Sequence, residues 1–177
     1  MMKLIPDGYH AVNPSLIVKD PAKAIQFYQD VFGAKEALRL ADASGVIAHA
    51  EIDIGDTRIF LGPESKEWGN LSPETTGSSP VVLHLYVADV DAVVQRAAAA
   101  GAKILIPVAD QFYGDRAGRI ADPFGHLWSV ATHKEDVSPA EMDRRMQEWM
   151  KTQAGADHHR AVVAVVREHV ENGSQVI

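Results

Sequence analysis

Two short segments of the chain carry the side chains best suited to proton transfer. His84 lies within the apolar run 81–87, and its near-neutral reference pKa makes it a natural proton carrier. The alternative is a hydrogen-bonded structural histidine on a sheet. Glu51 shares one face of the segment 48–54 with His49, so it is a candidate base or metal ligand, or part of a solvated strand face.

A second group of side chains is suited to holding a polar ligand. It occupies the segment 110–116 together with Arg119. Arg116 and Arg119 each offer a rigid fork of donors for a carboxylate or phosphate, and Tyr113 offers a hydroxyl on an apolar ring. The alternative is that these cations hold an irregular loop, through the ion pairs Asp115–Arg116 or Asp122–Arg119.

The composition excludes several classes of function. The 177 residues include no cysteine, so thiolate nucleophiles, disulfides and Cys-ligated metals are absent. The formal net charge of −7 argues against nucleic acid or an anionic membrane as the main partner. The N-terminus does not resemble a signal peptide, and no run approaches the ~18 apolar residues of a membrane span, so we expect a cytoplasmic protein.

The elements that position these residues form an internal repeat. The segment 18–20 (VKD) recurs as 87–89 (VAD), and 33–35 (GAK) recurs unchanged as 101–103. Each unit begins with a β-branched strand that leads into an aspartate, a residue that can cap a helix. Two copies of one βαβββ unit are therefore predicted.

Helices are expected to begin after Asp20 and Asp89 and to end before Gly33 and Gly101, because their apolar residues recur at helical spacing. The strands of the first unit are placed at 15–18, 37–40, 46–54 and 57–61. Those of the second are placed at 81–87, 103–108 and 126–132, with an irregular stretch through 119–121.

The remaining segments connect or extend the two units. Residues 62–80 are rich in Ser, Gly and Pro and read as a long loop. Ser138 to Glu141 form a capping box with Pro139 in the first turn, and a further helix is expected over 157–171. The predicted boundaries are 8–62 for the first module, 63–79 for the loop, 80–134 for the second module and 135–177 for a C-terminal helical extension.

The repeat resembles the vicinal-oxygen-chelate superfamily, which includes glyoxalase I, extradiol dioxygenases and bleomycin-binding proteins. The segments LIVKDPAKAIQFYQDVFGA, LHLYVADVDAV and DQFYGDRAGRIADPFGHLWSVATH resemble its PhnB-like branch, and the resemblance covers about residues 10–133. It implies an α+β fold in which two βαβββ repeats form curved mixed sheets around a cavity.

The resemblance also locates the positions that bind metal in metal-dependent relatives. Carried over residue by residue, they fall on Asn13, Phe60, Val82 and Ser129. Val82 and Phe60 cannot ligate a metal, and Asn13 and Ser129 are poor ligands for zinc, nickel or iron. The usual metal site is therefore expected to be lost, and no cofactor is predicted.

Strand alternation then assigns the second unit's side chains. If Val82 faces the cavity, His84 and Tyr86 do so too, whereas Leu83 and Leu85 meet the helices. Trp128 is expected in the core. The predicted cavity lining is Asn13, Phe60, Val82, His84, Tyr86 and Tyr113.

Three functions fit this pattern. The first is a metal-independent protein that binds an aromatic or amphipathic small molecule. The second is a lyase or isomerase in which His84 or Glu51 moves a proton and Arg116 or Arg119 holds an oxyanion or carboxylate; a variant of it places a divalent metal at His49, Glu51 and His84. The third is a structural role in which the C-terminal helices dock another protein. A homodimer is expected from the resemblance.

Overall fold

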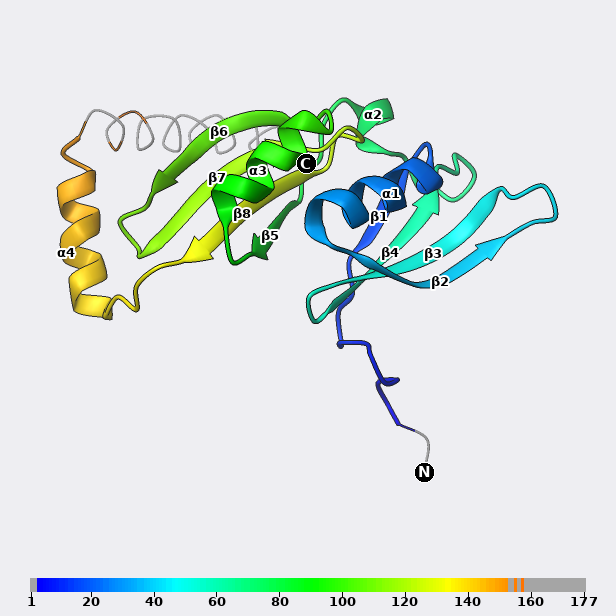
Figure 1. The fold of residues 1–177 in the computed structure, drawn as a ribbon, viewed down its shortest axis with the longest axis horizontal. Helices are drawn as coiled ribbons and strands as arrows, with labels where there is room; N and C mark the ends of the chain where they lie inside the picture. Colours follow the sequence, from blue (N-terminus) through cyan, green and yellow to red (C-terminus); the bar gives the residue numbers. More distant parts are fainter. Residues whose placement is uncertain (1–2, 153–154, 156, 158–177) are drawn as a thin grey trace, which may run out of the picture. The chain divides into compact units, whose positions relative to one another are not determined.

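The structure, a computed structural model, describes residues 3–152, 155 and 157 (Figure 1). The chain forms two compact units. In the described part, the first unit contains residues 3–109 and 117–132, and the second contains residues 110–116 and those from His133 onward. The tip of one hairpin is thus grouped with the C-terminal extension.

Two four-stranded sheets confirm the α+β fold with paired βαβββ repeats. Each sheet has the first strand of its repeat at one edge, next to the last strand, and these two strands run parallel. The first sheet has the order β1-β4-β3-β2, from β1 Ser15–Val18, β2 Lys35–Ala41, β3 Ile47–Ile54 and β4 Thr57–Pro63. The second has the order β5-β8-β7-β6, from β5 Val82–Tyr86, β6 Lys103–Asp110, β7 Asp115–Ala121 and β8 Leu127–His133.

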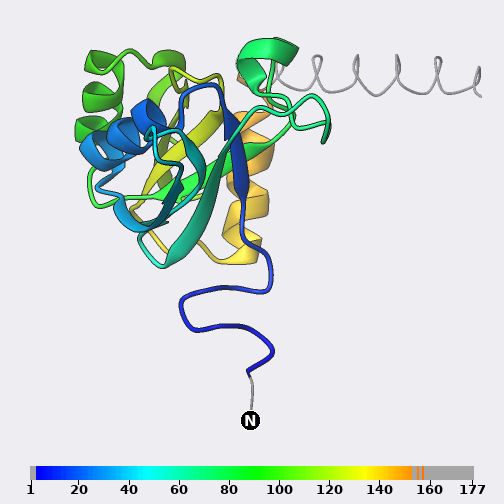
Figure 2. The same ribbon diagram turned by 90° about the vertical axis from the view of Figure 1, so that its right-hand side faces the viewer.

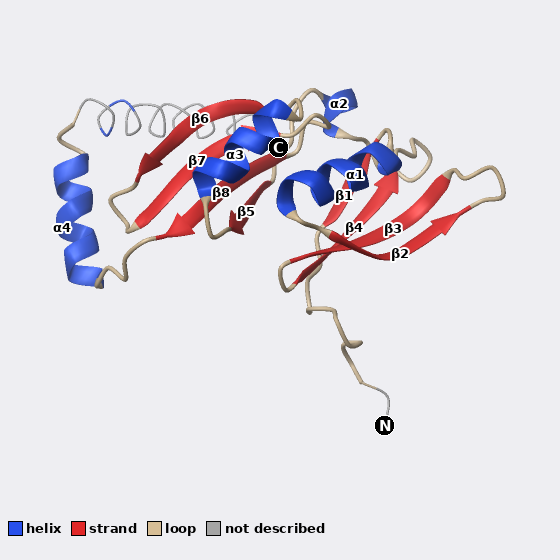
Figure 3. Ribbon diagram, viewed as in Figure 1, coloured by secondary structure: helices blue, strands red, loops and turns tan. Residues whose placement is uncertain are grey.

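One helix of each repeat lies across one face of its sheet (Figure 3). In α1 (Pro21–Phe32) the Asp20 carboxylate accepts a hydrogen bond from the Lys23 amide, and Gly33 ends the helix in the left-handed conformation with φ of 69°. In α3 (Val90–Ala99) the Asp89 carboxylate accepts from the Ala92 amide. Both predicted helices and their aspartate caps are therefore confirmed.

The prediction of an irregular stretch through 119–121 was wrong, because these residues complete strand β7. Gly118 explains why the sequence of this strand does not look like that of a regular strand. A Cβ at this position would lie 3.0 Å from the Val108 side chain and 3.1 Å from the Ile106 carbonyl oxygen. Close approach of β6 therefore requires a residue of low strand propensity in the middle of the strand.

The two repeats share one hydrophobic core. Helices α1 and α3 contact each other and lie side by side (Figure 2). The Trp128 ring, as predicted, is buried, and its centroid lies 4.7 Å from that of Phe32 and 5.5 Å from that of Tyr28. Aromatic side chains of the first repeat therefore pack directly against the last strand of the second.

A buried carboxylate stands at the centre of this packing. Asp122 accepts hydrogen bonds from the Tyr28 hydroxyl at 2.7 Å and from the Trp128 indole at 2.9 Å. It also accepts from the amides of Phe124 and His126. Burial, and then the charge of Asp122, raises the pKa of Tyr28 well above its ordinary value.

The segment that connects the repeats has more structure than its composition indicates. It contains the one-turn helix α2 (Pro73–Thr76) and an isolated bridge between Ser65 and Asn70. The Glu64 carboxylate accepts from both the amide and the hydroxyl of Ser72. Hydrogen bonds from Thr75 and Ser72 lower the pKa of Glu64 to about 2.

The second unit joins the hairpin tip to α4 (Pro139–Trp149). The Gly114 carbonyl oxygen accepts from the amides of Lys134 and Glu135, and a Cβ on Gly114 would collide with the Glu135 carbonyl oxygen. Ser138 caps α4 as predicted, through its hydroxyl and the amide of residue 141. The helix expected over 157–171 lies, apart from its first residue, outside the described residues. No helix in the described part of the chain is long and apolar enough to cross a membrane.

Candidate functional site

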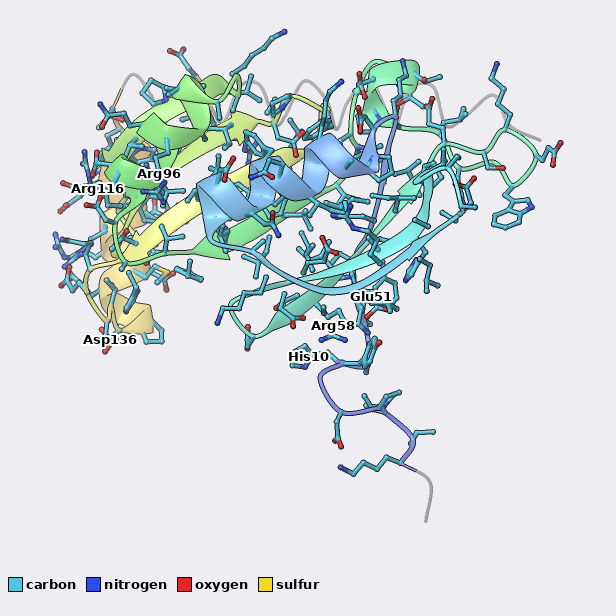
Figure 4. All side chains as sticks on the ribbon, turned by 45° about the vertical axis from the view of Figure 1, so that its right-hand side comes forward. His10, Glu51, Arg58, Arg96, Arg116 and Asp136 are labelled. Atoms are coloured by element: carbon cyan, nitrogen blue, oxygen red, sulfur yellow. The ribbon has the colours of Figure 1, made fainter. Side chains whose placement is uncertain are left out.

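Glu51 does not lie on a solvated strand face. Its side chain is 7% exposed and accepts hydrogen bonds from the Tyr9 hydroxyl at 2.7 Å, from Arg58 at 3.0 Å and from His49 at 3.2 Å. Figure 4 shows Glu51 and Arg58 together where the N-terminal segment meets the first sheet. Burial raises the pKa of Glu51, but these hydrogen bonds outweigh it, so the net pKa lies below the ordinary value.

Arg58 links this cluster to β3. Its guanidinium donates to both carboxylate oxygens of Asp53, at 2.8 and 3.0 Å, and lies 4.7 Å from the centroid of the Tyr9 ring. The hydrogen bonds from Arg58 hold the pKa of Asp53 below its ordinary value. Arg58 and the two carboxylates beside it are therefore partnered within the chain.

The N-terminal segment covers part of the first sheet. The Tyr9 ring meets Phe60 edge to face, with centroids 6.0 Å apart. The ring of His10 donates to the Asp56 carbonyl oxygen at 2.9 Å. Asn13 exchanges hydrogen bonds with the backbone of His10, so its amide is engaged in a local turn. Two of the predicted cavity residues, Asn13 and Phe60, are thus occupied by contacts with this segment.

The second sheet is different, because the face that carries His84 is exposed along its edge strand β5, and this part of the sheet is called its open face. Along β5 the side chains of Val82, His84 and Tyr86 are exposed, whereas Leu83 and Leu85 pack against the core. This is the alternation predicted from the sequence. Val82 is 39% exposed and Tyr86 is 59% exposed, so large apolar groups lie on a surface that no described residue covers.

Three polar residues form a row across this open face. His84 of β5 pairs in register with Ser129 of β8. In the turn between β7 and β8, the Asp122 amide donates to the His126 carbonyl oxygen, so these two residues face each other on antiparallel strands. Three residues further along each strand, Arg119 lies opposite Ser129. Arg119, Ser129 and His84 therefore lie side by side on neighbouring strands.

A hollow of about 270 Å³ adjoins the β5 end of this row, at His84. His84 and Tyr86 line it, together with Trp128 and the turn between β3 and β4 at Gly55 and Asp56. Most of the lining residues are apolar, as is typical of small-molecule sites.

The other predicted site residues lie elsewhere. Tyr113 and Arg116 belong to the second compact unit, where Arg116 pairs with Asp110 at 3.2 Å. The hypothesis of an Asp122–Arg119 ion pair was wrong, because the carboxylate of Asp122 is turned into the core. His49 and Glu51 are in contact on β3, whereas His84 lies on the other sheet.

The donor atoms do not fit the metal that the fold family implies. In the described part of the chain, no three His, Cys, Asp or Glu residues are grouped so that they could hold a metal ion. The residues at the expected ligand positions, including Phe60 and Val82, offer apolar side chains or weak donors. No role that depends on a metal is therefore assigned to His84 or Glu51.

A second hollow, of about 480 Å³, lies where the connecting segment passes β1 and the start of β5. It is lined mainly by small and apolar residues. Its titratable residue is His126, whose ring donates to the Ile17 carbonyl oxygen at 3.0 Å. None of the predicted site residues lines it.

Two important residues escaped the sequence analysis. Tyr9 lies 42 positions from the carboxylate that it binds, and nothing in its local sequence marks it. Asp122 is recognisable in the sequence as the first residue of the turn DPFG, but its role as acceptor for the Tyr28 hydroxyl and the Trp128 indole was not predicted.

Comparison with known proteins agrees with this geometry. Residues 9–130 match the Glyoxalase/Bleomycin resistance protein/Dioxygenase superfamily. Uncharacterized proteins of Mycobacterium bovis and Mycobacterium tuberculosis are each 39% identical over 139 residues, which cover 77% of this chain and 91% and 82% of theirs.

Solved structures share the fold. TioX from Micromonospora sp. ML1 is 28% identical, with a TM-score of 0.56, over 70% of this chain and 99% of its own. A PhnB protein from Bacillus cereus is 16% identical, with a TM-score of 0.55, over 70% of this chain and 99% of its own. A family enzyme from Burkholderia phytofirmans PsJN is 22% identical, with a TM-score of 0.55, over 67% and 94%. The chain therefore belongs to the glyoxalase/bleomycin resistance protein/dioxygenase superfamily, and its neighbours include a PhnB-like protein.

Proposed function

We propose that this protein binds an aromatic or amphipathic small molecule on the open face of its second sheet, without a metal ion. The observation that carries the proposal is the exposure of Val82 and Tyr86 on β5, of which Tyr86 also lines a hollow of about 270 Å³. Small-molecule sites are mostly apolar concave surfaces with a few placed polar groups, and His84 and Ser129 supply such groups here.

A lyase or isomerase is the second candidate, and one observation favours it. In the described part of the chain, the imidazole of His84 has no hydrogen-bond partner, although its ring lies 4.7 Å from that of Tyr86. It is therefore free to exchange a proton with a ligand. Glu51 is less suited to act as base, because three donors already hold its carboxylate and its lowered pKa weakens it as a proton acceptor.

The binding proposal is tested with N-phenyl-1-naphthylamine, a neutral aromatic dye that fluoresces in apolar surroundings. We expect saturable binding of one dye per chain that EDTA does not change. Val82→Asp should weaken it at least about tenfold, because a carboxylate on the open face costs more than about 1.4 kcal/mol when an apolar ligand covers it.

Val46→Asp is the matched control, since Val46 is 61% exposed on the other module. It should bind the dye like the wild type. Absence of saturable binding, abolition by EDTA, or equal weakening by both variants would each contradict the proposal.

A further inference from the structure

Arg119 is unusual among the cations of this chain. Its Nε is buried, and no hydrogen-bond acceptor reaches it. No ion pair or hydrogen bond joins its guanidinium to any residue in the described ranges, in contrast to Arg58, which is paired with Asp53 and Glu51. A desolvated N–H without an acceptor is costly unless a ligand satisfies it.

The carboxylates of the second sheet and of the turn after β7 have partners other than Arg119. The second sheet carries two aspartates, Asp110 at the end of β6 and Asp115 at the start of β7; both belong to the second compact unit, where Asp110 pairs with Arg116 and Asp115 with His133. Asp122 follows β7, but its carboxylate faces the core. Arg119 therefore has no ion-pair partner among the described residues, in a protein whose formal net charge is −7.

Arg119 lies in a row with Ser129 and His84, and this arrangement suits the binding of an anionic group. Two strand spacings separate the backbones of Arg119 and His84, roughly 10 Å. Ser129 lies on the strand between them and pairs in register with His84. A guanidinium and a hydroxyl on adjacent strands match the donors that a carboxylate, sulfonate or phosphate group accepts.

We propose that the molecule bound on this face carries an anionic group, which Arg119 and Ser129 hold while its apolar part lies against Val82 and Tyr86 near the hollow. This inference rests on the proposed function, and it adds the chemical class of the ligand. Arg119 is thus the residue that selects acidic aromatic ligands over neutral ones of the same shape.

The test compares two dyes that differ in one group. 8-Anilinonaphthalene-1-sulfonate is N-phenyl-1-naphthylamine with a sulfonate added. Arg119→Met should weaken sulfonate binding about tenfold to a hundredfold, the loss expected for a charge-assisted hydrogen bond in a partly buried site. It should change binding of the neutral dye by less than about twofold, which also shows that the variant is folded.

Arg39→Met is the control for net charge, because Arg39 pairs with Glu36 on β2 of the first sheet. It should leave the affinities for both dyes unchanged. Unchanged sulfonate binding in Arg119→Met, or equal losses for both dyes, would overturn the anion assignment while leaving the binding proposal intact. Failure of the neutral dye to bind the wild type at a Val82-dependent site would instead remove the proposed function itself.

Discussion

At the scale of single residues, two buried carboxylates connect different parts of the chain. Glu51 joins the N-terminal segment to the first sheet through Tyr9 and Arg58. Asp122 joins the two repeats through Tyr28 and Trp128. Both carboxylates are therefore held by donors within the chain.

Asp122 is therefore expected to be a major source of stability. Asp122→Ala leaves the Tyr28 hydroxyl, the Trp128 indole and two backbone amides without their acceptor, and it should lower the free energy of unfolding by about 3 kcal/mol or more. Urea denaturation measures this change. Asp143→Ala, an exposed position on α4, is the control and should change stability by less than about 0.5 kcal/mol. Equal stabilities of the two variants would show that Asp122 does not hold the two repeats together.

At the scale of elements, the sequence predicted most of the fold because its signals are local. The aspartate caps, Pro21 and the glycine that follows each repeat's helix lie within a few residues of the helix that they delimit. The regular strand conformation of residues 119–121 was not predicted, because tertiary contact with β6, not local propensity, decides the conformation of Gly118. The hydrogen bond from Tyr9 to Glu51 was not predicted for the same reason, since the two residues meet only in the folded chain.

The C-terminal extension is joined to the hairpin tip through a histidine between two carboxylates. His133 donates to Asp115 at 2.8 Å and to Asp136 at 3.0 Å, and these hydrogen bonds raise its pKa above the ordinary value of 6.5. Because the folded pKa is the higher one, the stabilisation is complete below about pH 6.5 and is lost as the pH rises through the folded value.

We therefore expect His133→Gln to lower the melting temperature more at about pH 6 than at about pH 9, where wild type and variant should converge. Thermal unfolding followed by circular dichroism at both pH values measures the difference. A gap between the two proteins that stays constant with pH would show that the charge on His133 contributes nothing to the fold.

At the scale of the whole molecule, the two repeats form similar sheets, but different parts of the chain contact them. The N-terminal segment engages the polar face of the first sheet, so that Glu51 and Phe60 are covered. The open face of the second sheet instead leaves Val82 and Tyr86 in contact with solvent. The two modules therefore do not offer matching surfaces to a ligand, which is consistent with binding on one module that needs no shared metal.

The exposed apolar surface of the second sheet leads to a prediction about assembly. Edge strand β6 carries Ile104, Leu105 and Ile106, each 48% exposed, and such surfaces are typical of contacts between chains. We expect light scattering to give twice the 19.2 kDa of one chain. Replacing Ile104 and Ile106 together by Asp should shift the protein towards the monomer, because the charges cannot be buried at a contact without partners. Leu4→Asp, at a position that is 98% exposed, should leave the mass unchanged. A wild-type protein that scatters as a monomer at every concentration would show that β6 forms no such contact.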